Sequence, residues 1–515
     1  MSHRNDVDRR EFLRLGLAAA AMPGAAIASQ NRRAALRDKP PNILIIVTDE
    51  HNHRVAGCYG NTTAKTPNLD RLAAGGVTFE TDYCNSPLCV PSRLSFTAGK
   101  YIHRVGAWNN DCWLPSADYP SLPRIMNAAG YESFLCGKQH YDATRRYGFH
   151  EIGGNMNNSF KTGFGSRRPA DDTTVNVRAG RARFADFHIG DTSPILNHDK
   201  AVTAGVVDFF SHWNRGQKPF FLFAGYLAPH FPIIVPEAYW QHYDGRIPMP
   251  EIPAGFLDSL PLNYKHLRYG FGLVDQTPAI VRKGRELYFG LTEWVDAQIG
   301  TVLQALEKSG AAENTVIIYT TDHGENMGEH GLWWKNCVYE QAAHIPLIVN
   351  WPKRWKGGQR RTGASSTVDV VRTIAGIGGA RVPDDWNGQS MLGWLDDPKA
   401  KWKDMAVTQY YAHNICSGYA MLRTGYWKYV YHCIPDKQHG PQRELYNLKE
   451  DPMEFHNLSA RPEQRQRVEA MHTALVKELG EHPDETEARC RADYAKGYGR
   501  TGGGRKGGRK KKAAA

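Results

Sequence analysis

The sequence lacks the marks of a disulfide-rich, zinc-binding or multi-span membrane protein. Its nine cysteines are an odd number, irregularly spaced, with no CxxC pair and no cysteine–histidine zinc spacing, so we expect no disulfide framework. No segment after the N-terminal leader is apolar enough to suggest a membrane span, and no internal repeat is visible. With 515 residues, 41% of them apolar, the chain can bury a large core, and we expect more than one domain.

The excess of positive charge is concentrated at the C-terminus. The formal net charge is +11, and seven of these charges lie in residues 500–512, which leaves +4 for the rest. Residues 496–515 are rich in glycine and have too little apolar content to offset the entropy of ordering, so we expect a solvated, disordered tail. RNA, anionic lipid or an acidic polymer are alternative partners for it. The nearly neutral body predicts no specific nucleic-acid partner.

Residues 1–28 have the pattern of an export signal. Arg9 and Arg10 precede a short apolar run, and the sequence AIA at 26–28 fits an A-x-A cleavage site. The segment resembles a twin-arginine signal, which implies the twin-arginine export machinery as a partner and a periplasmic or secreted location. An amphipathic N-terminal helix or an uncleaved anchor is the alternative.

Strand and helix patterns alternate through the central part of the chain. A Thr-Pro start at 66–67 marks one helix, and a stripe of apolar residues from Leu287 to Leu306, closed by Gly310, marks the longest. Continuous apolar runs, typical of strands covered on both faces, occupy 42–47, 220–226, 315–319 and 345–349. We therefore predict an α/β fold for residues 40–394, a doubly wound mixed sheet flanked by helices.

The pattern changes after about residue 395. Residues 420–432 are rich in aromatic and β-branched side chains with a turn at Gly425, as in an antiparallel hairpin. Apolar residues at helical spacing follow over 468–479. We expect a smaller C-terminal α+β domain over residues 395–485.

Polar side chains follow the expected strands at the edge where open α/β sheets bind ligands. Asp49 and Glu50 come directly after the first strand, and Asp322 and His323 follow the third. Convergence of these four would make a site for a hard divalent cation. Capping of loops and helices is the alternative role for such carboxylates. His230 follows the second strand, where a lone histidine is more often structural.

Cys89 stands where a helix is expected to start. Pro91 suits the first turn of a helix, so backbone N–H groups and the helix dipole would favour an anion at this point. The same location would lower the pKa of a thiol, so Cys89 is either a thiolate nucleophile or a small buried residue. Position alone does not decide between them.

Several motifs together resemble the type I sulfatases, the formylglycine-dependent family of the alkaline phosphatase superfamily. Cys89-Val90-Pro91-Ser92-Arg93, followed by Thr97-Ala98-Gly99, is similar to the signature in which an enzyme oxidises the cysteine to formylglycine (3-oxoalanine). The resemblance covers about residues 40–480 and implies a formylglycine-generating maturase as a partner. Further matches, in the family's order, are Gly137-Lys138-Gln139-His140, Pro229-His230-Phe231-Pro232, Asp322-His323-Gly324 with Gly328, His330-Gly331 and Lys335, and Glu444–Leu448 with Asp451-Pro452 and Asn457-Leu458.

The resemblance implies a ligand set and a nucleophile. Asp49, Glu50, Asp322 and His323 would bind one divalent cation, usually Ca²⁺, with Mn²⁺ or Mg²⁺ as alternatives. Formylglycine made from Cys89 would present two hydroxyls, one attacking sulfur and the other later expelling sulfate.

The resemblance also implies roles for the basic residues. Arg93 would hold residue 89 and its charge, while Lys138 and His140 would contact the diol, with His140 as the base. His230 would be the general acid for the departing oxygen, and Lys335 would bind sulfate.

Three positions depart from the usual family pattern. Glu50 stands where a second aspartate is common, and His323 where asparagine is common, and both changes affect the preference among cations. His344 stands where arginine is common, and its role is left open.

The substrate is predicted less narrowly than the reaction. Residues 83–89, 106–110 and 331–335 look most like the choline-sulfatase-like branch, which also contains enzymes for sulfated sugars. Candidates for the leaving-group pocket, with ordinary loop packing as the alternative, are Trp108, Asn109, Asn110, Asp111, Trp333 and His413.

These observations predict an exported sulfatase that acts on a sulfated carbohydrate. Hydrolysis of choline sulfate or another small sulfate ester is one alternative. A phosphonate monoester or phosphodiester hydrolase of the same superfamily is a second, and a non-catalytic binder of sulfated polymer is a third.

Overall fold

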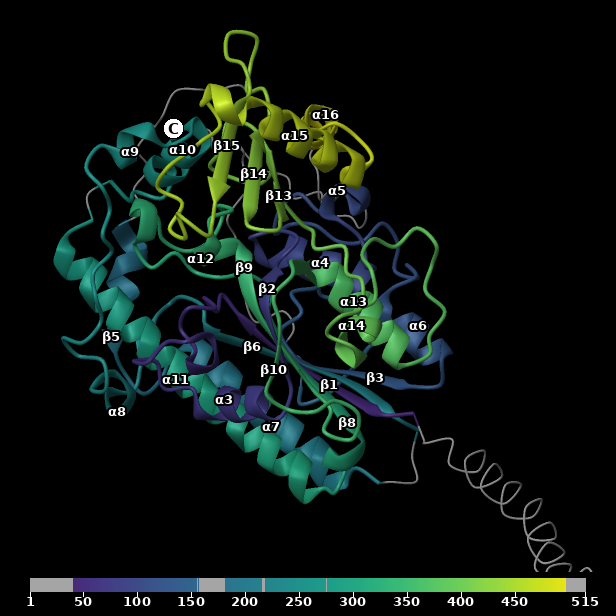
Figure 1. Ribbon diagram of the computed structural model, residues 1–515. Coiled ribbons are helices and arrows are strands. Elements are labelled where there is room, and N and C mark those ends of the chain that lie inside the picture. Colours follow the sequence, from purple (N-terminus) through teal and green to yellow (C-terminus); the bar gives the residue numbers. More distant parts are fainter. Residues whose placement is uncertain (1–39, 155, 157–180, 215–217, 275, 497–515) are drawn as a thin grey trace, which may run out of the picture. The chain divides into compact units, whose positions relative to one another are not determined.

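The computed structural model describes residues 40–154, 156, 181–214, 218–274 and 276–496 (Figure 1). The predicted export signal and all but the first residue of the basic tail lie outside these residues. The described residues from Asn42 onward form one compact unit. Within the described part of the chain, no helix combines the length and the apolar character needed to cross a membrane.

A mixed sheet forms the centre of this unit. Strand β1 (Asn42–Asp49) lies between β6 (Phe220–Pro229) and β8 (Thr315–Thr321) and runs parallel to both. Strand β9 (His344–Asn350) runs antiparallel to β8 and to β2 (Val77–Tyr83). The order is β10-β2-β9-β8-β1-β6-β3-β4, with β11 beside β2, where the remaining strands are β3 (Glu132–Gly137), β4 (His150–Glu151), β10 (Gln359–Arg361) and β11 (Ser365–Ser366).

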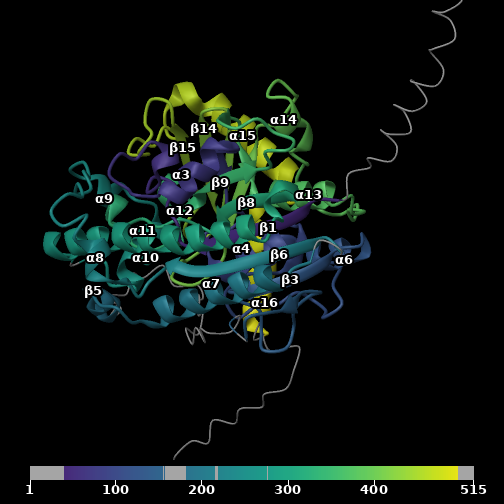
Figure 2. The same cartoon turned by 90° about the horizontal axis from the view of Figure 1, so that it is seen from below.

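Helices cover both faces of the sheet (Figures 1 and 2). On one face, Leu44 and Ile46 of β1 share a core with α3 (Pro67–Ala74), α7 (Pro194–His212) and α11 (Pro278–Lys308). On the other, Ile43 and Ile45 pack with α4 (Cys89–Ala98), α6 (Leu122–Ala128) and α13 (Thr367–Ile377). Successive side chains of a strand point to opposite faces, so a strand covered on both sides must be apolar throughout. The predicted mixed sheet with flanking helices is confirmed.

Shorter elements connect these layers. The short helices are α5 (Ile102–Val105), α8 (Glu237–Trp240), α9 (Phe256–Ser259), α10 (Leu262–Gly270), α12 (Glu340–Ala343) and α14 (Leu392–Asp396). The 3₁₀ turns are η1 (Gly57–Tyr59), η2 (Arg181–Asp186), η3 (Ala312–Asn314), η4 (Glu329–Gly331) and η5 (Pro462–Gln464). Strand β5 (His188–Ile189) pairs with β7 (Ile234–Val235).

The C-terminal part is an antiparallel sheet with helices. Its strands lie in the order β12 (Ala406–Tyr410), β13 (Tyr419–Thr424), β14 (Trp427–His432) and β15 (Gln442–Asn447). The predicted hairpin is β13–β14, and Gly425 adopts the left-handed conformation (φ 53°) that its turn requires. Helices α15 (Arg465–Leu479) and α16 (Pro483–Ala495) complete this part.

Strand β12 is bonded to the chain just before Cys89. The side chain of Asn85 donates to the carbonyl of Val407 (2.9 Å), and the amide of Gln409 donates to the carbonyl of Asn85 (3.0 Å). The hydroxyl of Thr408 donates to the carbonyl of Cys84 (2.6 Å). The C-terminal sheet therefore supports the segment that leads into α4.

A buried ion cluster forms a second connection, between the C-terminal sheet and α12. Lys428 of β14 has no exposed surface, and its ammonium lies 3.0 Å from Glu340 of α12 and 2.7 Å from Glu454. A second oxygen of Glu454 accepts a hydrogen bond from the amide of Glu340 (2.7 Å). We call Glu340, Lys428 and Glu454 the buried triad.

Candidate active site

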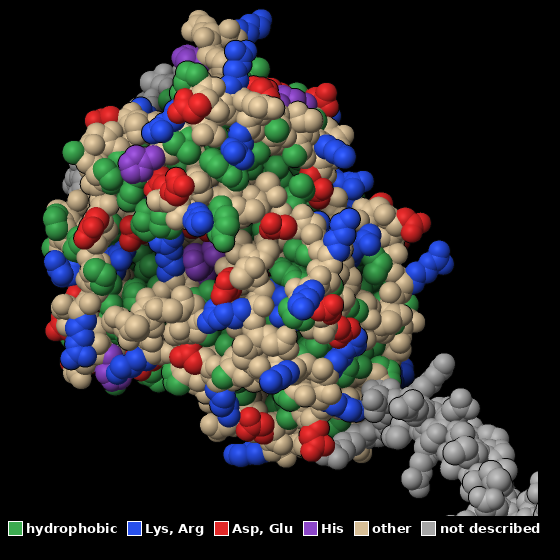
Figure 3. Space-filling model, viewed as in Figure 1, with side chains coloured by type: hydrophobic (Ala, Val, Ile, Leu, Met, Phe, Trp, Pro, Cys, Tyr) green, Lys and Arg blue, Asp and Glu red, His purple; other side chains and the backbone are tan. Residues whose placement is uncertain are grey.

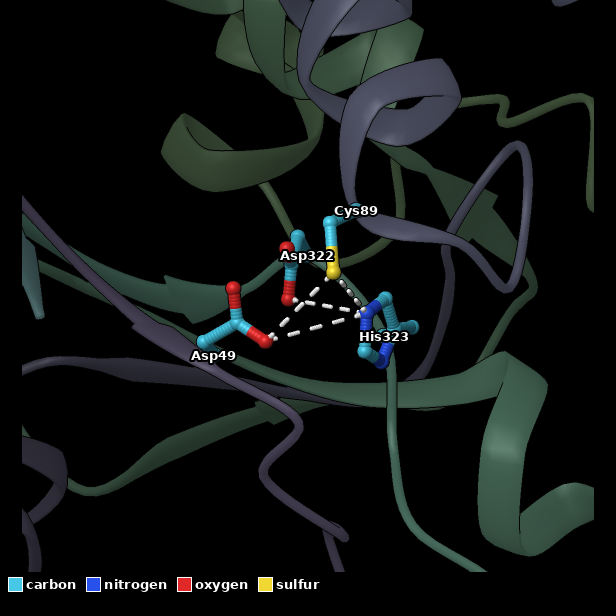
Figure 4. A group of neighbouring side chains, drawn as sticks. All are labelled: Asp49, Cys89, Asp322 and His323. Carbon is cyan, nitrogen blue, oxygen red and sulfur yellow. Dashed lines mark hydrogen bonds and ion pairs between the residues drawn. The ribbon is translucent and has the colours of Figure 1, made fainter. Parts of the chain in front are cut away.

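The predicted cation ligands meet at the carboxyl ends of β1 and β8, and Figure 4 shows three of them, Asp49, Asp322 and His323, beside Cys89. Thr48 pairs with Thr321, so the residues that follow the two strands are neighbours. Asp49, Glu50, Asp322 and His323 all lie at this point and are all buried. Ligand atoms of three of them gather with the sulfur of Cys89 within 4.8 Å of one another, and Asp49 and Glu50 form a second such group with His230.

Cys89 faces this cluster from the first residue of α4. Leu88 is extended and caps the helix, so the prediction that Cys89 lies at a helix N-terminus is confirmed. The sulfur lies 3.3 Å from Nε2 of His323 and 3.7 Å from Oδ1 of Asp49. The hydroxyl of Ser92 donates to the carbonyl of Asp322 (2.7 Å), which fixes α4 to the loop after β8.

One carboxylate oxygen in the cluster has no hydrogen-bond partner. It is Oε1 of Glu50, whose side chain is fully buried, while Oε2 lies 3.0 Å from the ammonium of Lys335. Burial raises the pKa of Glu50 well above its usual value, and Lys335 opposes this rise. A buried carboxylate oxygen without a partner is costly, and a bound cation would satisfy it. Three carboxylates and one imidazole are a donor set that suits a divalent cation.

Arg93 and Lys138 neutralise part of the acidic cluster. The guanidinium of Arg93 lies 2.8 Å from Asp49 and 2.8 Å from Asp322, and the ammonium of Lys138 lies 2.5 Å from Asp49. Burial alone would raise the pKa of Asp49, but Lys138 and His230, together with Arg93, hold it well below its usual range. A buried ion cluster of this kind is stable only because each charge is paired.

The cationic surroundings favour negative charge on residue 89. Burial and Asp49 oppose ionisation of the thiol, yet Lys138 and Lys335, with His323, lower the pKa of Cys89 well below its usual value. His140 is the second residue after Lys138, and its buried Nδ1 has no hydrogen-bond partner. Burial also lowers the pKa of His140. The site can therefore hold both an anionic group and a neutral imidazole.

His230 and Lys335 stand together on the other side of the cluster. Nε2 of His230 lies 2.7 Å from the ammonium of Lys335 and 3.3 Å from Oε2 of Glu50. Nδ1 of His230 donates to the carbonyl of Phe231 (2.5 Å), so Nε2 is the nitrogen that faces the cluster. Burial, followed by the positive charge of Lys335, lowers the pKa of His230 to about 4. Among the predicted site residues, the structure thus brings all six catalytic candidates around the ligand set.

Two candidates for the leaving-group pocket are bonded to α16. Trp108 is fully buried, and its indole N–H donates to Asp493 (2.9 Å). The side-chain amide of Asn109 donates to the hydroxyl of Tyr494 (3.2 Å). These contacts are the loop packing that the sequence left as the alternative.

The other four candidates are spread more widely. The side chain of Asn110 accepts a hydrogen bond from the amide of Val90 (3.1 Å), next to Cys89, while Asp111 is exposed. Trp333 is buried against Phe187, with ring centres 5.2 Å apart, and His413 contacts Phe271 with ring centres 5.9 Å apart. Of the six, Asn110 is bonded to the residue that follows Cys89.

Two further residues acquire roles that the sequence did not reveal. The hydroxyl of Tyr288 donates to the carbonyl of Glu50 (2.5 Å) and accepts from the amide of Asn52 (2.9 Å), which holds Glu50 in its left-handed conformation (φ 68°). Tyr288 belongs to the apolar stripe of α11, so its pattern predicts core packing alone. His344, whose role was open, bonds to Glu340 (2.9 Å) and stacks on His53 at 3.7 Å between ring centres.

The family assignment agrees with this geometry. The family profile described as Sulfatase matches residues 41–380, and the profile described as N-sulphoglucosamine sulphohydrolase, C-terminal, matches residues 328–481. The chain belongs to the sulfatase family and is a sulfuric ester hydrolase.

Named sulfatases and solved structures are similar to the chain over most of its length. The chain is 26% identical to an N-acetylglucosamine-6-O-sulfatase of Bacteroides thetaiotaomicron, over 87% of this chain and 88% of that protein. It is 26% identical to a choline-sulfatase of Rhizobium meliloti, over 82% of this chain and 83% of the relative. A solved structure of a protein in complex with its substrate D-glucosamine-2-N,6-O-disulfate has a TM-score of 0.69 and 23% identity, and covers 87% of this chain and 100% of that one.

Proposed function

We propose that the protein is an exported sulfatase that hydrolyses sulfate esters of a sulfated carbohydrate, with formylglycine made from Cys89 and one divalent cation. The observation that carries this proposal is the position of Cys89. It begins a helix, 2% exposed, with its sulfur 3.3 Å from a predicted cation ligand and with cationic side chains around it. Formylglycine made from Cys89 would lie directly beside the cation in this position.

Asp49, Glu50, Asp322 and His323 are the residues that would hold the cation. Ca²⁺ is our first choice because three of the four ligands are carboxylates, and the imidazole of His323 keeps Mn²⁺ or Mg²⁺ as alternatives. When bound, the cation supplies a Lewis acid for a sulfate oxygen. Arg93 then keeps Asp49 and Asp322 charged and oriented, because its guanidinium contacts both.

Formylglycine at position 89 supplies, as its hydrate, a hydroxyl nucleophile for sulfur. Lys138 stabilises negative charge beside it, and His140 takes the proton that must leave this residue for sulfate to be released. Both side chains follow the carboxyl end of β3, which runs parallel to β6 and ends at the same edge of the sheet.

His230 and Lys335 would serve the departing side of the ester. Nε2 of His230 faces the cluster and accepts a hydrogen bond from the ammonium of Lys335, since Nδ1 carries the proton of the neutral ring. The proton that Nε2 passes to the leaving oxygen would come from this ammonium, which would also bind sulfate. The 2.7 Å between these two groups supports a shared role for them at the leaving oxygen.

The substrate class is supported by the relatives. A relative named N-acetylglucosamine-6-O-sulfatase and a fold neighbour bound to a glucosamine disulfate favour a sulfated sugar. A relative named choline-sulfatase keeps a small sulfate ester as the second candidate. On the face seen in Figure 3, cationic and anionic side chains are interspersed, with no broad area of one sign that would favour a nucleic acid. The twin-arginine pattern at Arg9 and Arg10 supports export.

The test is the identity of the released anion. The protein is produced with a formylglycine-generating maturase, conversion of Cys89 is measured by mass spectrometry, and anion release is followed by ion chromatography. The substrates are glucosamine 6-sulfate, a sulfated glycan fragment, choline sulfate and a phosphonate monoester, with Cys89→Ala as the control. We expect sulfate from the sugar esters with the unmutated protein alone. Release from choline sulfate only would contradict the carbohydrate, and cleavage of the phosphonate ester without sulfate release would contradict the whole proposal.

A further inference from the structure

Strand β6 leaves its regular pairing just before His230. In the register with β1, Val47 faces Gly225 and Asp49 faces Pro229, so three residues of β6 stand opposite one residue of β1. Pairing with β3 also ends at Gly225. Residues 226–228 therefore form a bulge, and bulges near active sites redirect the side chains that follow them.

A buried carboxylate binds the amides of this bulge. Asp199 is fully buried in the first half of α7, and its Oδ1 accepts a hydrogen bond from the amide of Leu227 (2.8 Å). Its Oδ2 accepts from the amide of Ala228 (2.8 Å). Nδ1 of His198 lies 2.7 Å from Oδ1. One carboxylate thus replaces, for two successive amides, the bonds that a neighbouring strand would provide.

The bulge carries His230. The amide of His230 donates to the carbonyl of Leu227 (3.0 Å), so the turn that presents the imidazole starts from a residue whose own amide Asp199 holds. A displacement of Leu227 would therefore move Nε2 of His230 away from Lys335 and Glu50. Misplacement of a reacting group by about 1 Å can lower a rate by about 100-fold.

We infer that Asp199 is a positioning residue that sets His230 for protonation of the leaving oxygen. This inference rests on the proposed function. It gives a reason for a fully buried carboxylate in the interior of a helix, where such a group is costly unless its charge is used in hydrogen bonds. The conformation of the bulge at residues 226–228 is thus fixed by α7, a helix that contains none of the proposed catalytic residues.

The test uses the dependence of kcat/KM on the leaving group. kcat/KM covers the reaction through cleavage of the ester, and the need for an acid grows as the leaving oxygen becomes more basic. The substrates are 4-nitrophenyl sulfate, phenyl sulfate and an alkyl or sugar sulfate. We expect Asp199→Asn to lower kcat/KM by about 100-fold for the alkyl or sugar ester and by less than about 5-fold for the nitrophenyl ester. The kcat/KM of Asp199→Asn should therefore fall more steeply with the basicity of the leaving oxygen than that of the wild type, as we also expect for His230→Ala.

The matched control is Asp208→Asn, the same substitution on the same helix. Its carboxylate is 75% exposed and pairs with His212, and its variant should keep the wild-type dependence. Asp199→Glu, which keeps the charge but displaces it by one methylene, should give an intermediate dependence. A uniform loss across the three substrates would overturn the inference, and so would failure of both Asp199 variants to fold. A wild-type protein inactive on every sulfate ester would instead contradict the proposed function.

Discussion

Replacing Lys428 by methionine is expected to destabilise the protein strongly, because it removes the cation of the buried triad. Its ammonium lies 3.0 Å from Glu340 and 2.7 Å from Glu454, and none of it reaches solvent. At an effective dielectric constant of about 20, each contact corresponds to about 6 kcal/mol of Coulomb energy, which desolvation largely offsets. The net loss on removing one partner of such a buried group is about 3–5 kcal/mol.

The loss should depend on pH with a definite sign. Burial raises the pKa of Glu454 to about 7 although Lys428 opposes the rise, and removal of Lys428 would raise it further. A carboxyl whose pKa is higher in the folded state stabilises the fold at low pH, and this contribution is lost as the pH rises through the folded pKa. The deficit of the variant should therefore be larger at pH 8 than at pH 6, by about 1.4 kcal/mol per pH unit for each additional proton retained.

The assay is the free energy of unfolding, from urea titrations followed by tryptophan fluorescence at the two pH values. The control is Arg71→Met, which removes a surface ion pair with Glu307 whose side chains are 52% and 55% exposed, and should change stability by less than about 1 kcal/mol. A second variant, Lys428→Met with Glu454→Leu, should recover part of the loss because it removes an unpaired carboxylate. A deficit below about 1 kcal/mol, or one that is equal at pH 6 and pH 8, would refute this account of the triad.

Three further predictions concern the active site. Arg93→Met should lower sulfate release by at least about 100-fold, measured by ion chromatography, because Asp49 and Asp322 lose their shared cation; activity within about 5-fold of wild type would contradict this. Glu50→Gln should weaken Ca²⁺ binding by more than about 10-fold in isothermal titration, because one carboxylate ligand is neutralised, and an unchanged Kd would exclude Glu50 as a ligand. Tyr288→Phe should lower the unfolding free energy by about 1–3 kcal/mol, because the carbonyl of Glu50 and the amide of Asn52 lose their partner; an unchanged Tm would contradict it.

The sheet could be predicted because burial leaves a simple pattern in the sequence. The apolar runs that became β1, β6 and β8 are continuous since helices cover both faces. β9 also comes from a continuous apolar run, but such a run does not show whether the strand is parallel or antiparallel to its neighbours. In the structure, β9 is antiparallel to β8. An apolar strand has the same pattern in either orientation, so only the pairing itself decides.

The cation ligands could be predicted because they follow the ends of strands, whereas the residues that hold the site in place could not. Asp49 and Asp322 stand out because polar residues directly follow apolar strands. Trp108 is a predicted pocket residue because residues 106–110 resemble the choline-sulfatase-like branch, but its indole is bonded to Asp493. Asp199 does support the site, but its sequence pattern does not predict this, because an aspartate in an amphipathic helix is expected on the surface. Its carboxylate accepts hydrogen bonds from backbone amides of β6, and a sequence does not show which backbone groups a side chain will contact.

The bonds from β12 to the segment before Cys89 limit how such a protein can be recombined. Asn85 is held by Val407 and Gln409, and the triad joins α12 to β14. The two family profiles overlap over residues 328–380, so neither ends where the other begins. A chimera joined between β9 and β12 would pair one parent's nucleophile loop with the other parent's supporting strand. The exchangeable unit is therefore the whole body from Asn42 onward, and new substrate ranges are expected to arise through changes in loops.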